Sequence, residues 1–171
     1  MPNWISNSVM LTHDDPSKLK ELADIFEAKR PFNTLVPQPD WPNTPASEDI
    51  RDSQGEVKAK KGELPEKKVM KLANGEEEVW WNWPSSGRND DRWYDWCRKH
   101  WGTKWDTHDV DVEHQVANNM LILDFQTPWC PPDEIFHYLR KEKGYQFLTW
   151  EWSDECAPDE VGDLTDINWD D

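Results

Sequence analysis

Cysteine, histidine and aspartate side chains are concentrated in the middle of this 171-residue chain. Cys97 and His100 have CxxH spacing, and His108 and His114 follow them. Thiolate and imidazole groups are the ligands that zinc prefers, but structural zinc sites usually combine two such pairs. The chain has no second paired motif. We therefore expect no metal and no other cofactor, and zinc binding is kept as an alternative.

The same region has the residue types of a metal-dependent hydrolase. Asp106, Asp109 and Asp111 alternate with His108 and His114 in providing oxygen and nitrogen donors, which metal-assisted hydrolysis needs. However, alternating carboxylates on a strand usually form a solvated face. The chain also lacks a glycine-rich phosphate loop, a GxSxG elbow and an HExxH pair. We therefore expect a protein that is not an enzyme, with hydrolysis as an alternative.

Negative charge is the strongest global feature of the sequence. The net charge is −16, and residues 105–171 account for most of it, with 17 acidic and three basic residues. Such a field repels nucleic-acid phosphates and attracts basic partners. An acidic tail that only aids solubility is the alternative for the last 20 residues. The carboxylates predicted to bind a partner are Asp109, Asp111, Glu113, Asp124, Glu151, Asp154, Glu155, Asp159 and Glu160.

Hydrophobic patterning predicts an α+β fold. Alternating or apolar runs indicate strands, and apolar residues at i, i+3, i+4 and i+7 indicate helices. The resulting order is βαββαβ, a split βαβ pattern that folds as a four-stranded antiparallel sheet with two helices on one face, a ferredoxin-like fold. The predicted strands are 7–12, 109–114, 119–126 and 145–152, and the predicted helices are 16–28 and 131–143.

The remaining residues are assigned to an insertion and a tail. A proline-rich and then lysine- and glutamate-rich stretch predicts an insertion at about 31–105 in a single domain of residues 1–152. An Asn74-Gly75 pair within it favours a hairpin with a type I′ turn. Residues 153–171 form a separate acidic segment.

Tryptophan occurs 13 times, and four copies lie in WYDWCRKHWGTKWD, residues 93–106. Trp93, Trp96, Cys97 and Trp101 have helical spacing. Because apolar residues occur on both faces of the predicted sheet, we expect this Trp-rich helix to cover the face that the other two helices leave open. The alternative is that some tryptophans are partly exposed as contact anchors for a partner. These are Trp80, Trp81, Trp83 and Trp105.

Three scattered cysteines form no even disulfide framework, which favours a reducing compartment. The first residues lack the basic and apolar regions of a secretory leader. No run approaches the roughly 20 apolar residues of a membrane helix. We expect a cytoplasmic protein without membrane contact.

Four stretches of the sequence carry a family resemblance. They are MPNW at 1–4, FNTLVPQP at 32–39, WYDWCRKHWGTKWD at 93–106 and FQTPWCPP at 125–132. In these stretches the chain resembles the YubB ferredoxin-like domain proteins of phages and conjugative plasmids. The resemblance implies a ferredoxin-like fold but no catalytic residues. Members of the family commonly have cysteine near the position of Ile5, so a shared metal role is not expected at that position.

These features lead to a hypothesis from the class of interaction proteins. We expect a phage or mobile-element product that binds and inhibits a host nucleic-acid-processing or defence protein with a basic surface, as an acidic DNA mimic. An RNA-binding module is the alternative, because sheets of this topology can stack bases on aromatic side chains. Against direct nucleic-acid binding, no lysine or arginine occurs between Lys104 and Arg140 or after Lys143.

Overall fold

The computed structural model describes residues 2–169. The chain divides into two compact units, Met1–Pro37 with Cys97–Asp171 and Gln38–Trp96. The second unit falls inside the range predicted as an insertion. Among the described residues, every helix is too short or too polar to cross a membrane.

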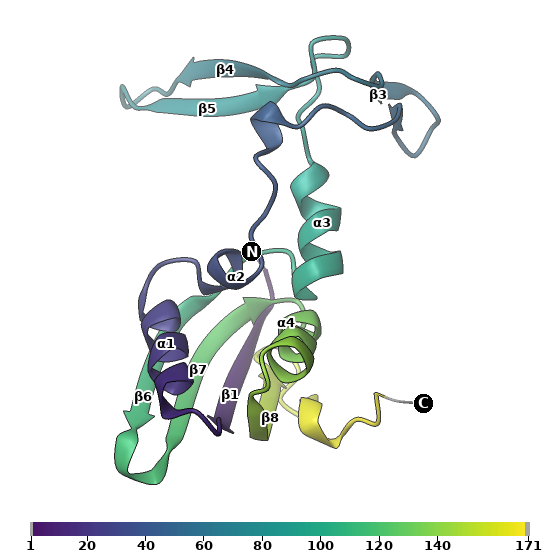
Figure 1. Ribbon diagram of the computed structural model, residues 1–171. Helices are drawn as coiled ribbons and strands as arrows, with labels where there is room; N and C mark the ends of the chain where they lie inside the picture. The colour runs from purple at the N-terminus through teal and green to yellow at the C-terminus, as the bar shows by residue number, and fades with distance from the viewer. Residues whose placement is uncertain (1, 170–171) are drawn as a thin grey trace. The chain divides into compact units, whose positions relative to one another are not determined.

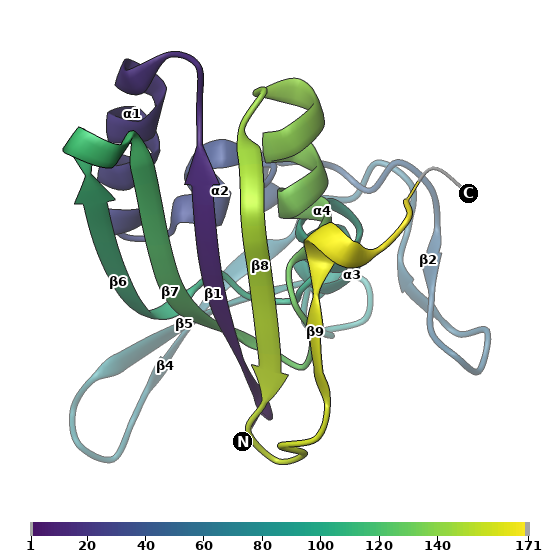
Figure 2. The same ribbon diagram turned by 90° about the horizontal axis from the view of Figure 1, so that it is seen from below.

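The first unit contains a five-stranded antiparallel sheet (Figure 2). The strand order is β6-β7-β1-β8-β9. The bounds are Trp4–Thr12 for β1, His108–Gln115 for β6, Met120–Pro128 for β7, Gln146–Asp154 for β8 and Val161–Asp163 for β9. The four predicted strands are present, but the prediction of a four-stranded sheet is wrong. The fifth strand comes from the acidic C-terminal segment.

Helices pack on one face of this sheet, where α1 and α4 lie in front of it in Figure 1. The bounds are Pro16–Glu27 for α1, Pro31–Leu35 for α2 and Asp133–His137 for α4, which continues as a π-helical turn, Tyr138–Glu142. The Asp15 carboxylate accepts a hydrogen bond of 3.0 Å from the Ser17 amide and so caps α1. Short 3₁₀ helices are Trp41–Asn43, Val116–Asn118 and Leu164–Asp166.

Aromatic rings make up much of the core between helices and sheet. Phe125 of β7 lies 5.5 Å from Phe26, 6.0 Å from Phe32 and 6.0 Å from Trp150, measured between ring centroids. Aliphatic side chains complete it. They include Val9, Leu11, Leu19, Leu22, Leu121, Leu123, Ile135 and Leu139.

A β-bulge changes which residues of β8 face this core. The register between β1 and β8 shifts between Met10 and Leu11, so that Val9 pairs with Trp150 but Leu11 pairs with Phe147. Phe147 and Trp150 consequently lie on the same side, with ring centroids 5.3 Å apart. In a regular strand these two rings would point to opposite faces, but the bulge adds a residue to one strand and brings them to the same face.

The Trp-rich helix is α3, Arg92–Trp101. Its residues up to Trp96 belong to the second unit, and those from Cys97 onward belong to the first. Trp101 packs edge-on against Phe32 at 6.0 Å and donates a hydrogen bond of 2.9 Å to the Val36 carbonyl oxygen. It therefore belongs to the core on the helical face. Trp96 contacts Trp41 within the second unit. The prediction that this helix covers the other face of the sheet is wrong.

The C-terminal segment is folded as far as the structure describes it. Leu164 is buried, and Trp169 packs edge-on against His137 at 4.4 Å. The Trp169 Nε1 donates to the Leu164 carbonyl oxygen at 2.9 Å. Residues 153–169 are thus not a free acidic tail, and residues 170 and 171 of the predicted segment lie outside the described residues.

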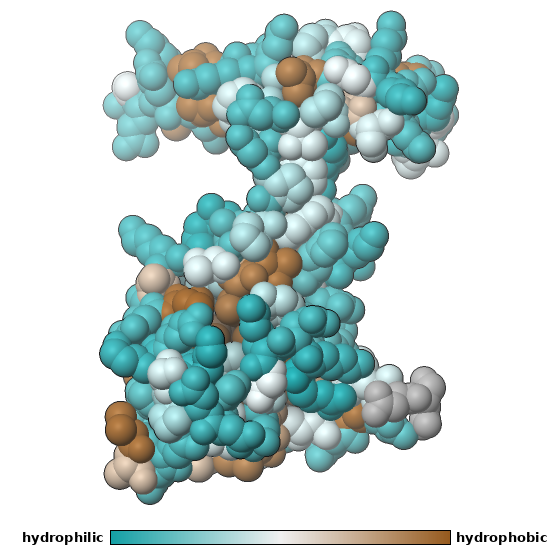
Figure 3. Space-filling view, in the orientation of Figure 1, coloured by the Kyte–Doolittle hydropathy of each residue, from teal (hydrophilic) through white to brown (hydrophobic). Residues whose placement is uncertain are grey.

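The second unit contains two small two-stranded sheets. The bounds are Ile50–Arg51 for β2, Val57–Ala59 for β3, Glu66–Lys71 for β4 and Glu77–Asn82 for β5. The predicted hairpin is confirmed as β4 and β5, but its connection spans residues 72–76, longer than a type I′ turn, with Gly75 at φ 86°. Hydrophobic side chains are exposed over these strands (Figure 3), among them Val69, Met70 and Val79.

A small core stabilises this unit. Ala46, Ala59 and Trp83 are buried together. The Arg92 guanidinium stacks over the Trp83 ring at 4.6 Å and forms an ion pair of 2.9 Å with Asp90. Cation–π contacts of this kind are worth more when they are desolvated, so Arg92 links the aromatic and polar parts of the unit.

Candidate functional site

The face of the sheet opposite the helices carries a row of acidic residues. Asp124 on β7 pairs with Asp111 on β6 and with Ser8 on β1, Ser8 pairs with Glu151 on β8, and Glu151 pairs with Asp163 on β9. Directly opposed residues point to the same face. The row crosses all five strands, a width of about 19 Å at about 4.8 Å between neighbouring strands. We call this surface the acidic face.

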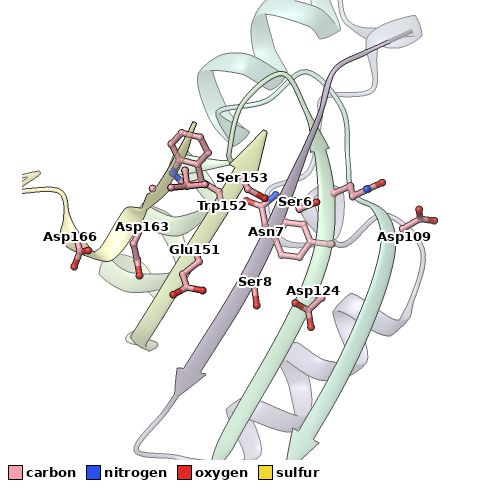
Figure 4. Close-up of a pocket in the computed structure, with 14 residues that line it drawn as sticks. Ser6, Asn7, Ser8, Asp109, Asp124, Glu151, Trp152, Ser153, Asp163 and Asp166 are labelled. Atoms are coloured by element: carbon pink, nitrogen blue, oxygen red, sulfur yellow. The ribbon is translucent and has the colours of Figure 1, made fainter. Parts of the chain in front are cut away.

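A shallow pocket of about 770 Å³ lies on the acidic face (Figure 4). Small side chains, Ser6 and Ser8 of β1 and Ser153 of β8, form part of its lining, with Asp124 and Glu151 on either side of Ser8. No lysine or arginine belongs to the described residues that line it. The pocket lining therefore combines short hydroxyl groups between carboxylates with apolar groups such as Trp152 and Val161.

Charges on the acidic face are not neutralised by neighbouring cations. Among residues 2–169, the carboxylates of Asp111, Asp124 and Glu151 form no ion pair. Like charges directly opposite one another on neighbouring strands destabilise a sheet, as for Asp111 and Asp124. These groups are available to an external cation.

Asp163 differs because the protein holds it with hydrogen bonds. Its Oδ1 accepts bonds from the Thr165 amide at 2.9 Å, the Thr165 hydroxyl at 2.6 Å and the Trp150 amide at 2.9 Å. Partial burial acts to raise the pKa of Asp163, but these hydrogen bonds outweigh it and hold the pKa below its ordinary value. Asp163 is thus a fixed negative charge at neutral pH.

Backbone geometry places a carboxylate of β6 at the pocket. Asp109 lies in the irregularity of β6 between His108 and Asp111 and has a left-handed conformation, φ 48°. Such a conformation is uncommon for residues other than glycine, although aspartate tolerates it better than most. It brings Asp109 into the pocket lining.

The structure brings together only some of the carboxylates predicted to bind a partner. Asp109, Asp124 and Glu151 line the pocket, and Asp111 completes their row. Glu113 follows two residues later on β6, where it pairs with Ile122. The other four lie outside the row, at the end of β8 and in the loop before β9. They are Asp154, Glu155, Asp159 and Glu160.

Local bonds explain two of these exclusions. The Asp154 carboxylate accepts hydrogen bonds from Asn3 at 2.7 Å and from the Cys156 amide at 2.8 Å. Glu155 accepts one from the Trp4 amide at 2.9 Å. Both groups fix the loop after β8. Sequence reasoning missed Asp163 and Asp166, which line the pocket, because a strand of three residues gives no periodic signal.

The predicted tryptophan anchors have different environments. Trp83 is fully buried in the small core of the second unit, so its prediction as a partly exposed contact residue is wrong. Trp80 and Trp105 are each 39% exposed, and Trp81 is half-buried. Trp105 packs beside Trp4 at 6.4 Å, and the Lys104 ammonium lies 4.4 Å from its ring centroid.

The cysteine and histidine residues singled out as metal ligands are not gathered. Within residues 2–169 no group of three or more His, Cys, Asp or Glu side chains could hold a metal ion. The His108 ring is stacked on Trp4 at 4.9 Å. Burial and the nearby Asp106 raise the pKa of the Cys97 thiol to about 12, so it is protonated at neutral pH and is a poor ligand.

Comparison with protein-family models, curated proteins and solved structures finds no match for this chain. The chemistry of the acidic face is therefore the basis for a functional assignment.

Proposed function

We propose that this protein is a non-enzymatic interaction protein that binds a basic surface of another protein through its acidic face. The observation that carries the proposal is the row of Asp111, Asp124, Glu151 and Asp163, with Ser8 at its centre and no lysine or arginine among the described residues that line the pocket. Such a surface matches a groove rich in lysine and arginine.

The partner that fits this chemistry is a nucleic-acid-binding protein. Its basic groove accepts a line of phosphates, and carboxylates fixed on neighbouring strands occupy the same groove as an acidic DNA mimic. Complementary charge of this kind accelerates association and makes it sensitive to salt. In line with the resemblance to phage and plasmid proteins, we propose a host nucleic-acid-processing or defence protein as the target, inhibited in the cytoplasm.

A ferredoxin-like relationship is part of the same proposal. The order β6-β7-β1-β8 and the antiparallel pairing of these strands support it, with β9 as an addition at the edge. The corresponding RNA-binding use of the sheet is less well supported. Phosphate attraction supplies most non-specific affinity for nucleic acid, and the acidic face provides the opposite charge.

The test compares two double variants that remove the same charge. Asp124→Asn/Glu151→Gln neutralises the acidic face, whereas Asp159→Asn/Glu160→Gln neutralises exposed residues of the loop before β9. The probe is an oligo-arginine peptide, with affinity measured across a salt series. The first variant should lose about tenfold in affinity at low salt, equivalent to about 1.4 kcal/mol, and show a weaker salt dependence. Equal behaviour of the two variants would contradict the proposal.

The inhibitory part of the proposal needs a functional readout. A basic nucleic-acid enzyme captured from host lysate at low salt should lose binding to a DNA duplex when the wild-type protein is added. The Asp124→Asn/Glu151→Gln variant should compete less well. Capture without competition would refute DNA mimicry while leaving docking in place.

A further inference from the structure

β6 is the last strand of the sheet, and its outer edge is open. It spans eight residues, His108–Gln115, and in the part of the chain that the structure describes it pairs with β7 alone. Among residues 2–169 no other strand or loop forms backbone hydrogen bonds to this outer edge. The regular part of this edge, residues 111–115, offers a row of free N–H and C=O groups to an extended segment of another chain, whereas the irregularity at Asp109 interrupts the row before it.

The space beside this edge is hollowed on the helical side. A groove of about 610 Å³ lies between the end of α1 and β6. Phe26 and Ala28 line it on the α1 side, and Val110 and Val112 line it on the β6 side. Two basic and two acidic residues also belong to the lining, so its charges balance. The groove thus offers apolar contacts to a side chain that points into it.

The other side of the same edge is acidic. Asp111 and Glu113 are exposed on β6, and they alternate with Val110 and Val112, which are partly buried. A strand added to β6 would alternate in the same way, because successive side chains point to opposite faces. Its residues on the acidic face would meet carboxylates, and those on the helical face would meet the apolar groove.

We infer that β6 accepts an extended segment of the partner as a sixth strand, with basic residues at every second position and apolar residues between them. The inference rests on the proposed function in taking the partner to be a basic protein. It adds the conformation and the sequence pattern of the segment that binds. Backbone hydrogen bonds supply affinity, and the carboxylates of Asp111 and Glu113 favour segments with positively charged side chains.

Charge argues against a second copy of this chain at the same edge. Antiparallel pairing of two β6 strands with their acidic faces on the same side sets Asp109, Asp111 and Glu113 of one copy against the same residues of the other. Like charges directly opposite one another are destabilising. β6 contains no proline or lysine, two residues that commonly protect sheet edges, and its irregularity lies between His108 and Asp111, outside the regular stretch 111–115. The acidic residues thus block self-pairing and leave the edge open to a basic strand.

The experiment uses the full-length protein and a peptide of alternating arginine and valine. Two derivatives carry N-methyl groups, either on every valine amide or on every arginine amide. In an extended peptide these two sets of amides point to opposite edges, so strand addition uses only one set. One derivative should bind like the parent peptide, and the other should bind at least about tenfold more weakly, because several backbone hydrogen bonds are lost together.

Hydrogen exchange provides the second readout. The parent peptide should slow amide exchange in residues 111–115 of β6, and sedimentation should show one protein chain per complex. If both N-methylated peptides bind as tightly as the parent, strand addition is refuted. The proposed function then survives if Asp124→Asn/Glu151→Gln weakens all three peptides. If none of the peptides binds at low salt, both proposals fail. A dimer that protects β6 without peptide also overturns the inference.

Discussion

Asp124 has a like charge on one neighbouring strand, Asp111, and a serine on the other, Ser8. Asp163 lies in the same row but receives three hydrogen bonds from backbone and hydroxyl donors. The two carboxylates therefore have opposite effects on folding. Hydrogen bonds stabilise the ionised Asp163, whereas the repulsion between Asp124 and Asp111 destabilises the sheet.

Asp124→Asn should stabilise the protein. Removing the charge relieves its repulsion with Asp111 and should raise the free energy of unfolding by about 0.2–1 kcal/mol at low ionic strength. The gain should shrink as salt is added. Urea unfolding at two salt concentrations measures it. Asp24→Asn is the control, because Asp24 forms an ion pair of 2.9 Å with Lys20; a similar gain there would point to net charge rather than to the row.

Asp163→Asn should lower the free energy of unfolding only at pH values at which the wild-type carboxyl is ionised. The folded-state pKa of Asp163 lies below its ordinary value, so its contribution is fully present above the unfolded value of about 3.9 and is lost as the pH falls through the folded value. The variant should be less stable than wild type at pH 7 and equal to it in strong acid. Unfolding midpoints across this range test the sign, and a constant difference would contradict it.

Gly102→Ala should be far more damaging than Gly144→Ala. Both glycines have positive φ, 82° and 72°, so both substitutions carry the same backbone strain. At Gly102 the new Cβ would also meet the Asp133 amide nitrogen at 2.9 Å, whereas at Gly144 the nearest atom is 3.7 Å away. Thermal unfolding of the two variants compares them. Equal losses would show that the close approach to Asp133 is relieved without cost.

At the scale of elements, the sequence predicts those that carry their own local signal. α1 has an aspartate cap, a proline in its first turn and one apolar stripe, and it forms as expected. β9 and the bulge opposite Met10 have no such signal, because their positions depend on pairing with β8. The acidic row could be predicted only in part for the same reason. Residues on separate strands become neighbours only through the pairing register of those strands, and the sequence pattern does not predict that register.

Trp169 is an aromatic contact that helps to hold the C-terminal segment, beside the pairing of β9 and the buried Leu164. Trp169→Ala removes the contact with His137 and the hydrogen bond to Leu164. Because Trp169 is only partly buried, the substitution should lower stability by about 1 kcal/mol, less than the loss of a fully buried large side chain, and should speed proteolysis within residues 155–169. Trp129→Ala is a matched control because Trp129 is 57% exposed. Limited proteolysis with mass spectrometry locates the cut, and unchanged cleavage in Trp169→Ala would show that β9 alone holds the segment.

At the scale of the whole molecule, the charge is unevenly shared between the two units. Residues 38–96 contain 13 acidic and nine basic residues, a balance of −4, whereas the remaining residues have a balance of −12. The sequence alone locates this excess near the C-terminus. In the structure, part of this excess negative charge lies on one face of one sheet. That face is therefore a candidate recognition surface rather than a general solubility feature.

The three carboxylates of the row that form no ion pair among residues 2–169, Asp111, Asp124 and Glu151, are a point of local frustration. A sequence selected for foldability alone would place neutral or oppositely charged residues at neighbouring positions of a sheet, as natural proteins do over most of their structure. Ser8 shows that a neutral side chain fits the middle of this row. Retaining acidic residues on both sides of it sacrifices conformational stability, and such a trade-off is expected where selection acts on recognition instead.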